Sequence, residues 1–335
     1  SVLGRLLFIL YTTPIPDLIR SYGLFSHSYA DDNQIYFCCA PDEVDRLLVN
    51  FSQCLDDLRR WLSVNRLKVN CDKTEVTWVT SKHGVNTSSR LSEPLAISDC
   101  VVQPSSSCRN LGVYFDNVLN MRQHINAVCR QCYFQLRQLR VIRRSLPTEV
   151  LKTLLHAFVS SRLDYCNSLL FGMPNCDIDK LQRVQNAAAR LVGGLARFDH
   201  VTPILRDTLH WLPVKQRIVF KIATLTFKCL TGQAPGYLQT LCLPVSSSQS
   251  LARNRSASRG DLIEPHCNTK RYGQRSFRFA AASVWNSLPV SIRQEQSLYS
   301  FRKHLKTHLF LRVITRNCIF ISFDNVPFLI FCAVY

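Results

Sequence analysis

Two adjacent carboxylates, Asp31 and Asp32, lie in the stretch "HSYADDNQIYF" from His27 to Phe37. The residue types on either side alternate as in two β-strands, and Asp-Asp-Asn is typical of a bend between strands. The sequence therefore predicts that both carboxylates lie on a hairpin turn. Carboxylates displayed on a rigid hairpin suit Mg²⁺, which takes oxygen ligands in near-octahedral geometry.

The cysteines and histidines give weaker indications of a metal site. Cys129 and Cys132 form a C-x-x-C pair, but no second ligand pair stands nearby at metal spacing, and the segment is typical of a helix. His304 and His308 are surrounded by basic residues, which favours a basic helix face over a metal site. The 15 cysteines are an odd number without framework spacing and with no signal peptide before them, which indicates reduced thiols in an intracellular protein. We expect it in the nucleus and/or the cytoplasm.

The elements that must position the carboxylates follow from the apolar periodicity. Residues 3–11 are apolar enough for a buried helix or a buried strand. Apolar residues at helical intervals predict an amphipathic helix over residues 42–64 that lies on a sheet. Short strands are predicted from Val76 to Val79 and over residues 110–116, with a polar loop over residues 80–92 before the second.

A helical region follows these strands. The helical pattern runs from about residue 120 to about residue 240. Proline cannot continue a helix, so this region should consist of separate pieces. The predicted divisions are at Pro147, Pro174, Pro203 and Pro213.

The positive charge is concentrated in one part of the chain. Among 335 residues there are 41 Lys and Arg against 23 Asp and Glu. Residues 1–100 contain 10 basic and 12 acidic residues, whereas residues 101–335 contain 31 and 11, a net charge of +20. This field suits a polyanion, of which nucleic acid is the commonest, although a solvated basic surface would give the same count.

The segment from Tyr272 to Pro289 interleaves arginines with aromatic residues. Arg275, Arg278 and Trp285 could provide phosphate contacts and base stacking, although a half-buried helix or strand would have the same composition. Residues 298–312 are typical of a final basic amphipathic helix. The apolar stretch that follows is interrupted by polar residues and a proline, so we expect no stable membrane insertion.

Four blocks together resemble a known family. They are "SVLG.LLFILY", "YADD", "WLSVNRLKVNCDKTE" and "LGVYFD", within residues 1–116. In order and approximate spacing they resemble the second half of the reverse transcriptase domain of non-LTR retrotransposons, the long interspersed elements of the chicken-repeat and jockey-like kind. Later segments, including "SRLDYCNSLL", "LHWLPVKQRI" and "WNSLPVSIRQ", resemble the region that follows the polymerase in these elements.

The resemblance implies an α+β fold with a partial right-hand polymerase palm, in which an antiparallel sheet packs against a helix. The palm would occupy residues 1–116 and a helical thumb-like region residues 117–243. A flexible basic linker over residues 244–262, a basic C-terminal region over residues 263–312 and an apolar tail over residues 313–335 would follow.

The resemblance also implies roles for individual residues in two-metal nucleotidyl transfer. Asp31 would be a ligand of Mg²⁺ or Mn²⁺, and Asp32 its less direct partner. Tyr29 would lie near the primer terminus, and Ala30 would leave room for the backbone. Lys73 would approach the phosphates of the incoming deoxynucleotide, as a mobile cation and a proton donor to pyrophosphate. The implied partners are an RNA template and a DNA primer.

The chain also departs from the family pattern. The strand with the first catalytic aspartate, and the fingers, lie upstream of the first matching block, and Arg5 stands where the family usually has proline. We therefore expect that the chain alone binds Mg²⁺ weakly and does not polymerise. The alternatives are a non-catalytic nucleic-acid-binding protein, whose salt-dependent affinity Asp31→Ala would not change, and a relic open reading frame.

Overall fold

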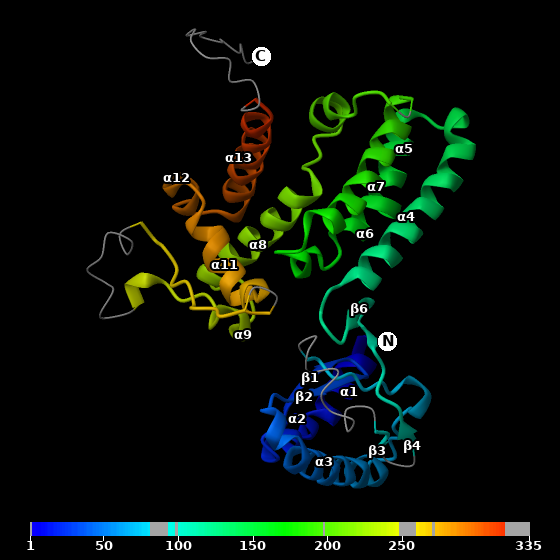
Figure 1. Ribbon diagram of the computed structural model, residues 1–335, viewed down its shortest axis with the longest axis vertical. Helices are drawn as coiled ribbons and strands as arrows, with labels where there is room; N and C mark the ends of the chain where they lie inside the picture. The colour runs from blue at the N-terminus through cyan, green and yellow to red at the C-terminus, as the bar shows by residue number, and fades with distance from the viewer. Residues whose placement is uncertain are drawn as a thin grey trace. The chain divides into compact units, whose positions relative to one another are not determined.

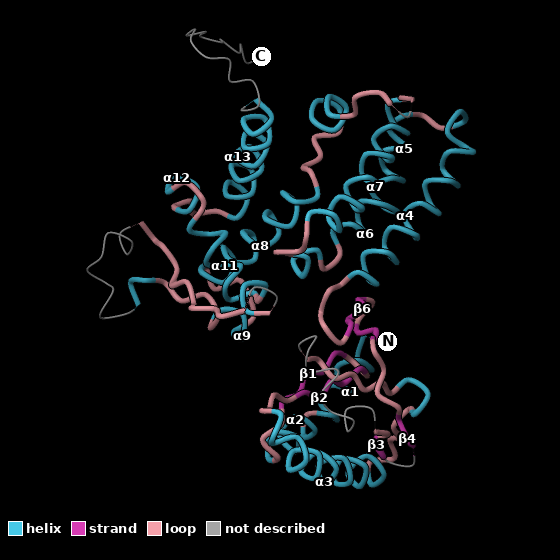
Figure 2. The backbone as a smooth tube through the Cα atoms, viewed as in Figure 1, coloured by secondary structure: helices cyan, strands magenta, loops and turns pink. Residues whose placement is uncertain are grey.

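The computed structural model describes residues 2–80, 93–97, 100–196, 198–247, 259–269 and 272–318 (Figure 1). The chain divides into two compact units, Ser1–Val118 and Leu119–Tyr335. Within the described residues the structure is mostly helical, with three two-stranded antiparallel sheets (Figure 2). The predicted α+β class is confirmed at this level.

The first unit contains the helices α1, α2 and α3 and six short strands. The helices are α1 (Val2–Thr12), α2 (Pro14–Ser21) and α3 (Val44–Val64), with short 3₁₀ turns at Pro41–Glu43 and Cys71–Lys73. The strands pair as hairpins: β1 (Phe25–Tyr29) with β2 (Asp32–Tyr36), β3 (Leu95–Ile97) with β4 (Cys100–Val102), and β5 (Ser107–Asn110) with β6 (Val113–Asp116).

The first hairpin is held in place by a small apolar core. The buried residues are Ile15 and Ile19 of α2, Leu24 just before β1, and Cys54 of α3, and side chains from β2 and its continuation pack against them. A hydrogen bond also joins the segment before β1 to α3: the Tyr22 hydroxyl donates to Asp57 Oδ2 at 2.5 Å. The predicted helix over residues 42–64 is confirmed, and its apolar side supports the hairpin as expected.

Three local expectations are corrected. Residues 3–11 belong to a helix, but most of its apolar side chains are exposed rather than buried, with Leu3 62% and Leu10 69% exposed. Between Val76 and Val79 there is no strand, only a single parallel bridge from Val76 to Pro104. Residues 110–116 are not one strand, because Leu111 and Gly112, with φ of 44° and 82°, form the turn between β5 and β6. Of the predicted polar loop, residues 81–92 lie outside the described residues.

The second unit is built from helices. These are α4 (Arg122–Ile142), α5 (Thr148–Leu155), α6 (Ser161–Asp164), α7 (Asn175–Gly193), α8 (Val214–Leu230), α9 (Gly236–Gln239), α11 (Phe277–Asn286), α12 (Val290–Arg293) and α13 (Leu298–Cys318). Short 3₁₀ turns lie at Arg143–Ser145, Asn167–Leu170, Val245–Ser247 and Gly273–Arg275, and π-helical turns at His156–Ser160 and Ile204–Thr208.

Prolines divide the helical region as predicted. The helices α5, α7 and α8 begin directly after Pro147, Pro174 and Pro213, each in an extended conformation with ψ near 150°. The π-helical turn Ile204–Thr208 begins directly after Pro203. Pro147, Pro174 and Pro213 precede the first turn and Pro203 lies within it, so the missing N–H of each removes no helical hydrogen bond.

The long helices α4 and α7 run parallel. At their starts, Arg122 Nε of α4 lies 3.2 Å from Asp177 Oδ2 of α7. At their ends, the Arg143 guanidinium donates to the carbonyl oxygens of Leu191, at 3.0 Å, and Val192, at 3.3 Å. The start of α4 therefore contacts the start of α7, and the end of α4 contacts the end of α7, as in a parallel pair.

Residues after the predicted linker share a core with α8. The Phe301 ring of α13 stacks on Phe227 of α8, with ring centroids 4.5 Å apart, and on Trp285 of α11 at 5.8 Å. The ends of the predicted linker meet in an antiparallel bridge between Pro244 and Leu262, while residues 248–258 lie outside the described residues.

The last helix is longer than predicted. Helix α13 continues past residue 312 to Cys318. Residues 319–335 of the predicted apolar tail lie outside the described residues. Among the described helices, none combines the length and the apolar character that crossing a membrane requires.

Candidate active site

The hairpin of β1 and β2 presents the two adjacent carboxylates at its tip. The register pairs Tyr29 with Asp32, so the turn consists of Ala30 and Asp31. The bend therefore comes earlier than the predicted Asp-Asp-Asn, and Asp32 is the first residue of β2. Both carboxylates are exposed. Ala30 has a φ of 55°, in the left-handed region that most residues avoid because Cβ approaches the following carbonyl oxygen, so the strand pairing on either side must hold this turn.

One face of this hairpin is aromatic and exposed. Paired residues share a face, so Asp32 lies on the same face as Tyr29, which is 68% exposed. On that face the His27 and Phe25 rings stack on Tyr36, with centroids 5.1 and 5.5 Å apart. This face therefore combines one of the carboxylates with rings on which a base or sugar can rest.

The other face of the hairpin fixes the turn and faces the core. There Ser28 Oγ donates to Asn33 Oδ1 at 2.7 Å, and Asn33 Nδ2 donates to the Asp31 carbonyl oxygen at 3.4 Å. Ile35 and Phe37 pack against the buried core below. The carboxylates are thus carried by a turn whose backbone is held by Asn33, on the face of the hairpin that packs on the core.

Lys73 lies in a separate segment that polar contacts connect to the hairpin. Its side chain is exposed in the 3₁₀ turn Cys71–Lys73. Two residues later, Glu75 Oε2 accepts from the Arg109 backbone N–H of β5 at 3.0 Å. Asn110 Nδ2, also of β5, donates to Gln34 Oε1 of β2 at 2.8 Å. Strand β5 therefore links both segments, although no hydrogen bond or ion pair between described residues joins Lys73 to Asp31 or Asp32.

Sequence reasoning did not identify Glu75, Asn110 and Gln34, the residues that make this connection. No local pattern marks them, because each contacts a residue more than 30 positions away. These hydrogen bonds form only when the folded chain brings β5 close to β2 and to the segment after Lys73.

The donors at the tip of the hairpin suit a divalent cation but are too few to hold one firmly. Carboxylate oxygens are the ligands that Mg²⁺ and Mn²⁺ prefer. A two-metal site needs more of them, and the described residues contain no group of three or more Asp, Glu, His or Cys side chains placed to hold an ion. Asp31 and Asp32 therefore do not by themselves make up a two-metal site.

The C-x-x-C pair does not resemble a zinc site in the structure. Cys132 is buried on α4, and burial raises the pKa of its thiol to about 12. Burial also raises the pKa of Cys129. A structural zinc site needs four ligands, and among the described residues no third His, Cys, Asp or Glu side chain joins this pair.

Of the three residues considered between Tyr272 and Pro289, two make contacts within the second unit. The Trp285 side chain is buried, stacked on Phe301, and its indole Nε1 donates to the Gly260 carbonyl oxygen at 2.9 Å, so no base can stack on it. The Arg275 guanidinium donates to the carbonyl oxygens of Leu119, Phe171 and Leu169, at 2.6, 3.3 and 3.4 Å. The structure thus gives both residues internal contacts, whereas Arg278 is exposed on α11 and stays a candidate.

Replacing Arg275 by lysine is expected to lower the free energy of unfolding by about 1–3 kcal/mol, because an ammonium cannot reproduce a fork that satisfies three carbonyl groups. Urea denaturation followed by circular dichroism would measure the change. The control is Arg278→Lys on the neighbouring exposed face, expected to change stability by less than about 0.5 kcal/mol. Equal effects at the two positions would show that the Arg275 contacts contribute little.

Comparison with known proteins adds one relative. Over 218 residues, or 62% of its length, the chain is 26% identical to a Drosophila melanogaster protein described as "Probable RNA-directed DNA polymerase from transposon BS". The match covers 23% of that protein. No family model matches the chain, and no solved structure matches it. The chain is thus distantly similar, over part of its length, to the reverse transcriptase of a transposable element.

Proposed function

We propose that this chain is the part of a transposon reverse transcriptase that carries the second half of the palm and the helices after it. The observation that carries the proposal is the Tyr29-Ala30-Asp31-Asp32 hairpin, which displays two exposed carboxylates at a tight turn. The distant similarity to an RNA-directed DNA polymerase supports it. In this proposal residues 1–116 belong to the palm and residues 117–243 to a thumb-like region, as in non-LTR retrotransposons.

The proposed roles follow the positions in the hairpin. Asp31, in the turn itself, is a metal ligand, and Asp32, beside it at the start of β2, supports the same site. Tyr29 is opposite Asp32 and exposed, as a residue near the primer terminus must be. Two divalent ions would activate the primer hydroxyl and stabilise the departing pyrophosphate. The chain's own contribution is to hold two of the carboxylates and to place Lys73 where it can meet phosphate groups.

The proposed partners are an RNA template, a DNA primer and deoxynucleotides. The distribution of charge supports this choice. The first 100 residues have a net charge of −2 and carry the carboxylates, whereas residues 101–335 have a net charge of +20. A polyanion would therefore be held mainly by the second unit, while the hairpin supplies the acidic groups of the chemistry.

The 335-residue chain alone is expected to show no primer extension above the background of its Asp31→Asn variant, because two carboxylates are an incomplete metal site. A longer protein, joining this chain to the upstream part of the palm, is expected to extend a primer on an RNA template with Mg²⁺. Incorporation of labelled deoxynucleotide measures both. Asp31-dependent extension by the chain alone, or none by a folded longer protein, would contradict the proposal.

A further inference from the structure

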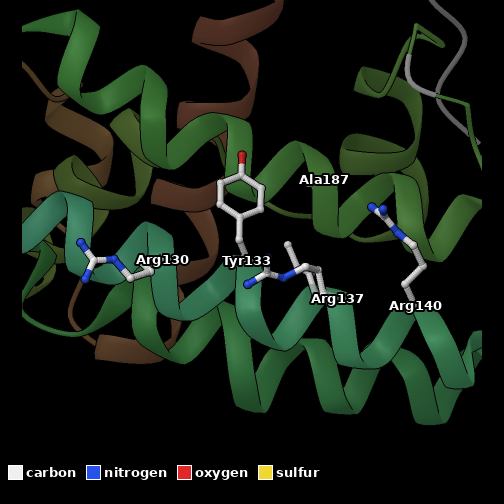
Figure 3. Close-up of a pocket in the computed structure, with 6 residues that line it drawn as sticks. Arg130, Tyr133, Arg137, Arg140 and Ala187 are labelled. Atoms are coloured by element: carbon white, nitrogen blue, oxygen red, sulfur yellow. The ribbon is translucent and has the colours of Figure 1, made fainter.

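A groove with arginines along one side lies on the surface of the second unit, between α4 and α7. It has a volume of about 500 Å³ and is lined by Arg130, Tyr133, Leu136, Arg137 and Arg140 of α4 and by Ala187 of α7. Figure 3 shows Arg130, Tyr133, Arg137 and Arg140 rising from one helix, with Ala187 on the neighbouring one. None of these residues belongs to the candidate active site.

The helical repeat of α4 produces this arrangement. Positions 130, 133, 137 and 140 are spaced by three and four residues, so their side chains share a face. Ile125, Cys132 and Leu139 are buried on the other side of the helix, which fixes its orientation. Helix α4 contains no Asp or Glu, so no acidic residue of this helix neutralises the arginines.

Helix α7 contributes the opposite side of the groove. Arg183, Ala187 and Arg190 are spaced by four and three residues, so they share a face, and the small Ala187 side chain leaves the groove open. Burial raises the pKa of the Tyr133 phenol, and the nearby Arg183 guanidinium acts against that shift. Arg190 Nε is buried without a hydrogen-bond partner among the described residues.

The arginines of the groove have charge available for a ligand. Within the described part of the chain, no ion pair involves Arg130, Arg137 or Arg140, and all three are exposed. With a rise of about 1.5 Å per residue, they extend over about 15 Å of the helix. Several successive phosphates of one nucleic-acid strand fit along this length.

We propose that this groove binds a single strand of nucleic acid, with the arginines on its phosphates and the Tyr133 ring stacked on an unpaired base. Tyr133 is 40% exposed and lies between Arg130 and Arg137, and the apolar Leu136 and Ala187 side chains line the groove beside it. A basic groove with an interleaved aromatic ring is the arrangement that binds single strands without sequence preference. Duplex bases are stacked on each other and could not use the ring.

This inference deepens the proposed function and rests on it for the choice of nucleic acid among polyanions. Its test measures binding and needs no polymerisation, so the groove proposal and the proposed reverse transcriptase function can be contradicted independently. Asp31→Asn, which removes a proposed metal ligand, is expected to leave binding in the groove unchanged.

The experiment measures fluorescence anisotropy of a labelled oligouridine of about 15 nucleotides, a length within the usual site sizes, with the full chain over a range of salt concentrations. Each phosphate contact to a single strand contributes about 0.7 to the slope of log affinity against log salt. The triple variant Arg130→Gln, Arg137→Gln, Arg140→Gln is therefore expected to lower this slope by about 2 and the affinity by about tenfold or more.

A matched control removes the same charge elsewhere in the second unit. Lys215→Gln, Lys221→Gln and Lys303→Gln together change exposed lysines of α8 and α13, outside the groove lining, and are expected to change the slope little. Tyr133→Ala is expected to weaken binding about fivefold or more, while Tyr133→Phe keeps it. Thermal melting by circular dichroism checks that each variant is folded.

Three outcomes would overturn the proposal. They are equal slopes for the groove and control triple variants, an unchanged affinity in Tyr133→Ala, and tighter binding of a duplex of the same length than of the single strand. The first would place the phosphate contacts elsewhere on the basic surface. The others would show that the groove does not hold an unpaired base.

Discussion

Replacing Asp31 by asparagine is expected to reduce primer extension by about 10³-fold or more in a protein that joins this chain to the upstream palm. Asp31 is one of the two residues of the hairpin turn, exposed and held at its carbonyl oxygen by Asn33. An amide keeps the shape of the side chain but removes the negative charge that a divalent ion requires. Asp32→Asn is expected to cost less, because Asp32 is the less direct partner.

The control for this prediction is Asp42→Asn, which removes another exposed carboxylate of the first unit, in the 3₁₀ turn Pro41–Glu43 and not in the hairpin. Its extension rate is expected to stay within about twofold, since surface substitutions rarely matter. Single-turnover incorporation of one deoxynucleotide separates chemistry from binding of the template. Full activity in Asp31→Asn, or equal losses in the two variants, would remove Asp31 from the proposed catalytic centre.

Sequence reasoning located the hairpin but not its turn. Alternation of residue types indicated two strands, and in the structure the partly buried Ile35 faces the core while Tyr36 is exposed on the other face. The bend was placed too late, because Asp and Asn favour turns whereas alanine does not. In the structure Ala30 takes the positive φ, and Asp32 is paired with Tyr29. The position of the turn follows from the register in which β1 and β2 pair, and not from the turn preferences of the individual residues.

The helices of the second unit could be divided from the sequence because proline acts locally. The roles of Arg275 and Trp285 could not be assigned in this way. Arginine beside aromatic residues is common to nucleic-acid surfaces and to half-buried helices, and the distinction lies in distant partners. Arg275 donates to Leu119, which is 156 residues away, and Trp285 stacks on a ring of α13.

The groove on α4 was missed for a related reason. Its arginines stand at helical spacing in the printed sequence, and α4 contains no acidic residue. These observations indicate a basic face but not a groove, because the opposite side comes from α7. The parallel direction of the two helices depends on Arg122 with Asp177 and on Arg143 with the end of α7.

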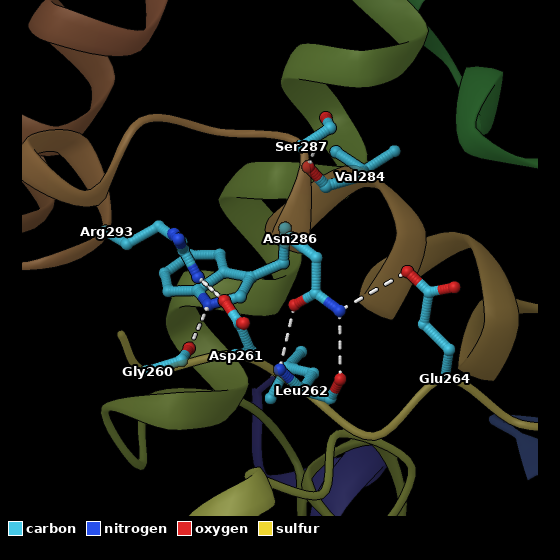
Figure 4. Close-up of polar contacts among 9 residues, drawn as sticks. Gly260, Asp261, Leu262, Glu264, Val284, Asn286, Ser287 and Arg293 are labelled. Carbon is cyan, nitrogen blue, oxygen red and sulfur yellow. Dashed lines mark hydrogen bonds and ion pairs between the residues drawn. The ribbon is translucent and has the colours of Figure 1, made fainter. Parts of the chain in front are cut away.

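Replacing Asp261 by alanine is expected to lower the free energy of unfolding of the second unit by about 3–5 kcal/mol, because it leaves the charge of Arg293 buried and unpaired. The Arg293 side chain is 5% exposed, and its guanidinium is paired with the Asp261 carboxylate. Figure 4 shows the network around this pair, in which Asn286 accepts from the Leu262 N–H and donates to its carbonyl oxygen. Urea denaturation measures the change.

Two controls distinguish the buried charge from the loss of a side chain. Glu149→Ala removes one partner of the exposed pair with Lys152 and is expected to cost less than about 1 kcal/mol. The double variant Asp261→Ala, Arg293→Met replaces the buried pair by apolar groups and is expected to recover most of the lost stability, since the isolated charge is gone. If the double variant were as unstable as Asp261→Ala, the cost would come from the segment around Gly260 and Leu262 losing its attachment to α12, which ends at Arg293. The pair would then serve to dock this segment, and its charges would contribute little.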